Sequence, residues 1–60
     1  MTKDIRYTTC SAIDAFNKQD ELIKAEKKRF YVNSYESSSR IDANGILLKQ
    51  YTYEVYELIN

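Results

Sequence analysis

Alternation of polar and apolar side chains marks the beginning of the chain, over residues 4–10. Ile5, Tyr7 and Thr9 fall on one side of an extended backbone there, with charged or polar residues between them. Aromatic and β-branched residues at every second position are typical of a short strand. We therefore expect a first strand over about residues 4–10.

A helical period replaces this alternation after Ser11. Ser11 followed by Asp14 has the spacing at which a hydroxyl caps a helix N-terminus. Basic residues at 27–29 would complement the dipole at the other end. The sequence therefore predicts a helix over about residues 12–28. Its expected core face carries apolar residues at helical spacing: Ala12, Ile13, Phe16, Ile23 and Phe30, with Ala15 and Leu22 widening the stripe.

Two further strand-like runs follow, over about residues 30–40 and 46–58. They are separated by a turn over residues 42–45, which contains the pair Asn44-Gly45. An Asn-Gly pair between alternating runs indicates a β-hairpin, and glycine suits the positive φ that such turns need. The last run is the longest and most apolar, so we expect it in the middle of the sheet, in the order 1-3-2.

The register of this hairpin is predicted from its side-chain faces, because a slip of one residue moves every side chain to the other face. A two-residue turn would give two mixed faces. A three-residue loop with a glycine bulge puts Ile41 opposite Leu47, Tyr35 opposite Tyr53 and Asn33 opposite Val55, and it separates a dry face from a wet one. The helix is expected to cover the dry, tyrosine-rich face, whose main residues are Ile41, Leu47, Tyr51, Tyr35, Tyr53, Val55 and Tyr31.

Together these elements predict a single α+β domain over residues 1–60 with a βαββ or αββ order. One helix packs on a three-stranded or two-stranded antiparallel sheet that includes a long C-terminal hairpin. A chain of 60 residues buries only a thin core. Such a domain depends on good packing or on association with a partner.

The composition excludes disulfides, Cys/His metal sites and catalysis by histidine. Cys10 is the only cysteine and there is no histidine, so neither an internal disulfide nor a Cys/His metal site can form. The common catalytic base is also missing. We expect no enzyme activity, no cofactor and no metal.

The location of the chain follows from what its sequence lacks. The first ten residues do not have the charged and then apolar pattern of a secretory signal, and no apolar run approaches the length that spans a bilayer. We expect a cytoplasmic protein without a membrane partner. Many Lys, Ile, Tyr and Asn residues indicate an AT-rich genome, and with the small size they favour a phage or mobile-element product acting in a host cytoplasm.

Nine basic and nine acidic residues cancel, so no strong attraction to nucleic acid is expected. A basic and aromatic cluster after the helix nevertheless gives a rival interpretation, in which cations hold phosphates and rings stack on bases. Binding of nucleic acid would then use Lys27, Lys28, Arg29, Arg40 and Lys49.

The favoured interpretation is a small non-enzymatic module that binds a host or cognate protein and inhibits or modulates it. Its partner surface is expected at the open end of the hairpin, on the face away from the helix. Apolar side chains gathered there in water would mark an interface. The expected contacts are Phe30, Val32, Glu54, Tyr56 and Leu58. Two copies pairing through them, or a self-assembling structural subunit, are the alternatives.

Overall fold

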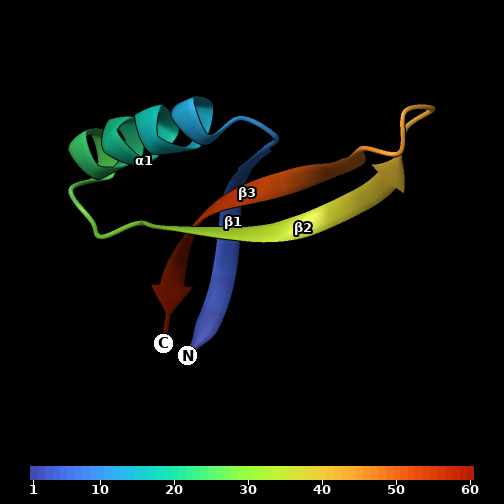
Figure 1. The fold of residues 1–60 in the computed structure, drawn as a ribbon. Helices are drawn as coiled ribbons and strands as arrows, with labels where there is room; N and C mark the ends of the chain where they lie inside the picture. The colour runs from blue at the N-terminus through green and yellow to red at the C-terminus, as the bar shows by residue number, and fades with distance from the viewer.

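The computed structural model describes all 60 residues and confirms a small α+β domain with the order β1-α1-β2-β3. Strand β1 spans Thr2–Thr9 and helix α1 spans Ala12–Glu26. Strands β2, Tyr31–Ile41, and β3, Leu47–Ile59, form the hairpin (Figure 1). The first strand exists, so the sheet has three strands.

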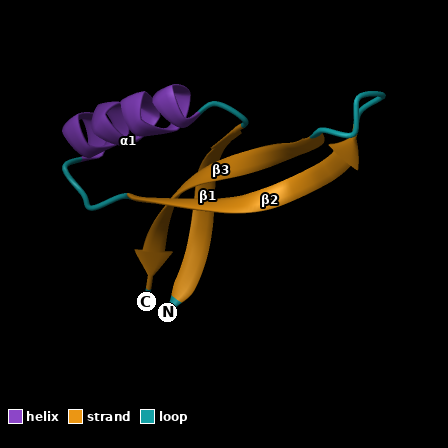
Figure 2. Ribbon diagram, viewed as in Figure 1, coloured by secondary structure: helices purple, strands orange, loops and turns teal.

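The sheet has the order β1-β3-β2, and each neighbouring pair is antiparallel. This confirms the prediction that the longest strand lies in the middle. The helix covers one face of the sheet and no element covers the other, while the turn end of the hairpin projects away from the helix (Figure 2). Thr2 pairs with Ile59, so the two ends of the chain lie side by side.

The helix begins as expected and ends earlier. Its N-cap is Ser11, whose side chain accepts a hydrogen bond of 3.3 Å from the backbone N–H of Asp14. Lys27 adopts a left-handed conformation with φ of 54° and donates its N–H to the carbonyl of Ile23 at 2.8 Å. This αL cap ends the helix at Glu26, two residues before the predicted end.

The buried face of the helix differs from the predicted stripe. Ala15 and Leu22, seven residues apart and therefore on one side, are buried against Phe30 and Val55. The half-buried residues Tyr7, Val32 and Tyr53 complete the core. The side chains expected to lead the stripe are instead exposed: Ile13 by 73%, Phe16 by 56% and Ile23 by 38%.

The rotation of the helix about its own axis explains this difference. Phe16 and Ile23 each follow a buried residue by one position, which turns them by about 100° around the helix axis. They therefore lie on a flank of the helix. The small Ala15, which is fully buried, belongs to the same core cluster as Val55.

The hairpin turn is as predicted. Gly45 has φ of 79°, its N–H donates to the carbonyl of Asp42 at 3.0 Å, and Asp42 in turn donates to the carbonyl of Ile46 at 3.0 Å. The carboxylate of Asp42 also accepts the N–H groups of Asn44 and Ile46, each at 2.9 Å. Ile41 pairs with Leu47, which confirms the bulged register next to the turn.

A second bulge farther along the hairpin overturns the rest of the predicted register. The pairing shifts between Glu36 and Ser38, so Tyr35 faces Thr52 and Asn33 faces Glu54. The predicted pairs of Tyr35 with Tyr53 and of Asn33 with Val55 are therefore wrong. The inserted residue, Ser37, donates its hydroxyl to the carbonyl of Gln50 at 3.0 Å.

This bulge at Ser37 exchanges the two faces of the first half of β2. Val32 now pairs with Val55 and lies under the helix, and Phe30 is only 2% exposed. Tyr31 and Tyr35, predicted under the helix, lie on the uncovered face. The exchange favours folding, because it buries fully apolar side chains and leaves the tyrosine hydroxyls next to water.

Ion pairs fasten the C-terminal end of the helix to the sheet. Arg6, at a bulge in β1, contacts Glu26 of the helix at 2.7 Å and Glu57 of β3 at 3.4 Å. Lys28 contacts the same two carboxylates, at 3.9 and 3.4 Å. Glu57 is only 7% exposed, so these two cations compensate a nearly buried charge. The hydrogen bond from Arg6 holds the pKa of Glu26 below its ordinary value.

Replacing Gly45 should weaken the hairpin through its backbone alone. No atom lies within 4 Å of the position of an added Cβ, so Gly45→Ala meets no steric clash but keeps the unfavourable positive φ. We expect a loss of about 1 to 2 kcal/mol in the free energy of unfolding, measured by urea denaturation. Asn44→Ala is the matched control, since Asn44 has no positive φ and should change stability by less than about 0.5 kcal/mol. Equal effects of the two changes would contradict the turn geometry.

Acidification should destabilise the domain partly through Glu26. Its folded pKa is lower than its unfolded pKa, so the stabilising contribution is present at neutral pH and is lost as the pH falls through the folded pKa. Glu26→Gln should therefore flatten the decline in stability below about pH 4.5, measured by urea denaturation at a series of pH values. Glu21→Gln, at a carboxylate whose ion pair with Lys18 is exposed to solvent, should change that decline much less. An unchanged slope in Glu26→Gln would show that the pair with Arg6 does not form in solution.

Candidate functional site

The uncovered face of the sheet is the most developed surface of this domain. Because side chains alternate along a strand, the residues beside buried Val55 point to this face, and Tyr56 is one of them. Tyr56 lies at the centre, since it pairs with Ile5 of β1 on one side and with Tyr31 of β2 on the other. We call this surface the open face. It consists of Lys3, Ile5, Thr8, Tyr31, Asn33, Tyr35, Thr52, Glu54, Tyr56 and Leu58.

Aromatic and ionic contacts order the centre of the open face. The rings of Tyr31 and Tyr56 are stacked, with centroids 5.5 Å apart and planes at 27°. The ammonium group of Lys3 lies 4.8 Å from the centroid of Tyr56 and donates to the carboxylate of Glu54 at 2.8 Å. Asn33 donates to the same carboxylate at 3.4 Å. These contacts hold Tyr56 and its neighbours in place before any partner binds.

The charges of the open face compensate each other. The hydrogen bond to Glu54 raises the pKa of Lys3, and the same bond lowers the pKa of Glu54. Both groups therefore stay charged around neutral pH and form an ion pair. The open face presents no net positive field to an approaching polyanion.

Apolar side chains surround this centre and remain in contact with water. Ile5 and Tyr35 are each 46% exposed, and Leu58 is 44% exposed. Aromatic residues and aliphatic residues on a flat surface with a few polar groups are typical of the central part of a protein interface. The arrangement suits recognition of another protein surface.

The structure brings three of the five predicted protein contacts together on the open face: Glu54, Tyr56 and Leu58. The other two were placed wrongly. Phe30 is part of the core and Val32 packs against that core, because the bulge at Ser37 turns them under the helix. Their apolar character was not a sign of a partner surface.

Sequence reasoning missed the other members of the open face, among them Lys3, Ile5, Tyr31 and Tyr35. The two tyrosines were missed because of the register. Ile5 and Lys3 could have been found, since a first strand beside the predicted central strand would place alternate β1 residues on each face. The alternation in residues 4–10 was the available signal.

The basic residues of the rival interpretation do not form one cluster. Lys28 is engaged with Glu26 and Glu57, while Lys27 caps the helix at an exposed position. Arg29 is exposed beside them. Arg40 lies nine residues beyond Tyr31, the first residue of β2, which corresponds to roughly 30 Å of extended chain.

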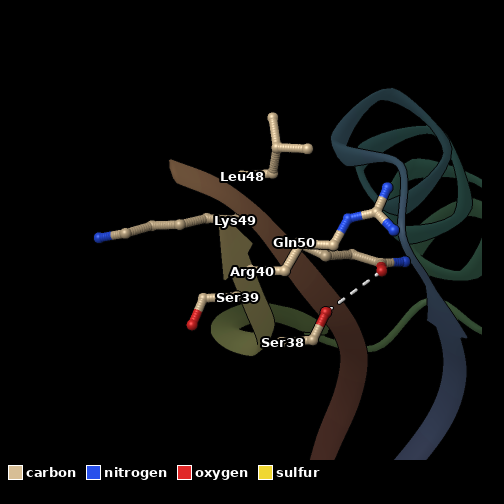
Figure 3. A pocket seen from close by; sticks show the side chains of 6 residues that line it. All are labelled: Ser38, Ser39, Arg40, Leu48, Lys49 and Gln50. Carbon is tan, nitrogen blue, oxygen red and sulfur yellow. Dashed lines mark hydrogen bonds between the residues drawn. The ribbon is translucent and has the colours of Figure 1, made fainter. Parts of the chain in front are cut away.

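Arg40 and Lys49 also point in different directions. They line a shallow hollow of about 380 Å³ near the turn end of the hairpin, together with Ser38, Ser39, Leu48 and Gln50. Figure 3 shows Lys49 and Ser39 pointing away from Arg40 and Gln50. The hydroxyl of Ser38 donates to Gln50 at 3.4 Å. Two cations on opposite sides of a hairpin do not make a continuous track for phosphates.

Other kinds of site are sparse in this structure. No three His, Cys, Asp or Glu side chains come close enough together to hold a metal ion. Helix α1 is too short and too polar to cross a membrane. The thiol of Cys10 is exposed and accepts a hydrogen bond of 3.4 Å from the amide of Gln50.

Comparison with known proteins adds no candidate site, because no family model, no curated protein and no solved structure matches this chain.

Proposed function

We propose that this domain is a protein-binding module and that it binds its partner through the open face. One observation carries the proposal. Tyr56 is stacked on Tyr31 at the centre of a face that no helix covers, and exposed apolar side chains surround it. Tyrosine supplies a large contact area with little conformational entropy to lose, which is why it is frequent among residues that dominate binding energy.

The chemistry of this face defines the partner it fits. A complementary surface offers apolar groups to Ile5, Tyr35 and Leu58, and polar groups to the tyrosine hydroxyls and to the rim of Glu54 and Asn33. The ammonium group of Lys3 on this face is already paired with the carboxylate of Glu54, so it offers little attraction to the phosphates of a nucleic acid. A protein surface therefore suits the open face better than a phosphate backbone.

A host-cell target and an inhibitory effect remain predictions from the size and composition of the chain. Occupying a surface of the target is the mode of action that the open face supports, since it requires no chemistry from the module itself. The absence of catalytic activity and the cytoplasmic location also remain predictions.

Charged substitutions on the open face should abolish binding. Tagged wild-type chain would capture its partner from an extract of the source organism, and calorimetry with the purified partner would then measure affinity. Ile5→Glu and Leu58→Glu should each weaken binding by about 30-fold or more, as expected for residues in the centre of an interface. Both side chains are about half exposed, so the free energy of unfolding should change little.

Ile13→Glu is the matched control, because Ile13 is exposed on the helix, away from the open face. The same substitution there should leave affinity unchanged. If Ile5→Glu and Leu58→Glu bind like wild type while Ile13→Glu does not, the partner surface is on the helix side and the proposal is wrong.

A further inference from the structure

The two outer edges of the sheet are protected very differently. Strand β1 carries Lys3, Asp4 and Arg6 on its short length, and its bulge falls at Arg6. Charges and bulges are the features that keep edge strands from pairing with other chains. Strand β2 has neither feature over its first five residues, 31–35, where the side chains are uncharged and the pairing with β3 is regular. Its bulge comes only afterwards, at Ser37.

The helix has two different flanks above these two edges. Lys18 lies over the ring of Tyr7 in β1, at 5.5 Å, and the flank on that side also carries Asp14 and Glu21. Gln19 donates to the carbonyl of Phe30, at the beginning of β2, at 2.9 Å. The flank on the β2 side is therefore the one that exposes Phe16 and Ile23.

A polar flank thus stands above the protected edge, and an apolar flank stands above the unprotected edge. We propose that a second copy of this chain pairs with β2, antiparallel and about a two-fold axis. The two sheets then form one six-stranded sheet, with both helices on the same face. A two-fold axis lets one level of each helix face its own copy, and Phe16 is the residue at that level, while Ile23 lies about 10 Å farther along the helix.

The two-fold symmetry restricts the register of this pairing. In a symmetric antiparallel pair the axis passes midway between a residue and its own copy, and Asn33 is the centre of the regular stretch 31–35. With Asn33 on the axis, Tyr31 faces Tyr35 of the second copy on the open face. No like charges face each other in this arrangement.

Charge complementarity supports the same register. Continuing the pairing by one position places Phe30 opposite Glu36 of the second copy, and it brings the exposed Arg29 next to that carboxylate. Neither Arg29 nor Glu36 forms an ion pair within one chain. The symmetry gives two such contacts, one on each side of the axis.

The shape of the single chain leaves surface for this association. Its radius of gyration is 14.5 Å, whereas a compact domain of this length has about 10 Å. Its accessible surface is 4588 Å², against roughly 4100 Å² for a compact protein of the same mass. A net charge of zero means that two copies do not repel each other.

The distances across the axis suit helix contact. Neighbouring strands lie about 4.8 Å apart, so an axis beside β2 runs roughly 7 Å from β3, the strand that the helix contacts most. A helix with its side chains has a radius of about 5 to 6 Å. Large side chains are therefore needed to fill the space between the two helices. Phe16 lies on the flank of the helix that faces this space.

A cysteine on the axis tests the proposed register directly. In a Cys10→Ser background, Asn33→Cys places two thiols on residues that face each other, within the Cα separation that a disulfide requires. Mild oxidation should give a covalent dimer on a non-reducing gel. Ser34→Cys is the matched control, because it is also exposed but its copy lies roughly 8 Å away across the axis, so it should give no covalent dimer on the same gel.

Sedimentation equilibrium of the unmodified chain tests the association itself. We expect a dimer whose dissociation constant rises by about 30-fold or more in Phe16→Glu. Asn17→Glu, on the other side of the helix, should leave the dissociation constant unchanged. A chain that stays monomeric up to millimolar concentration, or equal crosslinking by the Asn33→Cys and Ser34→Cys variants, would overturn the proposal.

The two binding proposals can fail separately. Leu58→Glu alters the open face but not the β2 edge, so it should remain dimeric while losing the partner. A dimer that is lost in Leu58→Glu and kept in Phe16→Glu would show that copies associate through the open face, which contradicts this inference. Partner binding by a monomeric Phe16→Glu variant would leave the proposed function intact.

Discussion

The bulge at Ser37 is the constraint on which most of this structure depends. One extra residue in β2 reverses the two faces of the strand between the hairpin turn and the helix. Without it, Tyr31 and Tyr35 would lie beneath the helix, and Phe30 and Val32 would lie in water. With it, the domain obtains an apolar core of only four buried residues and a surface rich in tyrosine. Core and candidate binding surface are therefore two results of the same backbone irregularity.

Much of the fold could be predicted because its signals are local. The cap at Ser11 and the turn at Asn44-Gly45 each depend on residues within a few positions of one another. The position of β3 in the middle of the sheet followed from its length and apolar character. Each of these features is determined by backbone conformation or by the composition of one segment, which a single sequence contains.

The bulge and the buried face of the helix could not be predicted in the same way. Nothing in the run Ser37-Ser38-Ser39 distinguishes a bulge from regular pairing, because serine suits both. The choice is made by the energy of burying Phe30 and Val32, which depends on where the helix lies. The rotation of the helix about its axis depends in turn on burying Ala15 and Leu22 in the same cluster as Val55. Of the predicted contacts, Glu54, Tyr56 and Leu58 lie on the expected face, because they belong to β3 and were unaffected by the shift in β2.

The turn end of the hairpin has a dynamic consequence. Strand β1 ends where Thr9 pairs with Tyr53, so residues 38–50 have one neighbouring strand, and nearly all of them are exposed. A two-stranded ribbon without a packed face is only marginally stable. Its backbone amides can therefore exchange with solvent through local opening, while those of the region around Val55 require global unfolding. The domain then consists of a cooperative base and a separately fluctuating extension, and the boundary between them lies near Ser37.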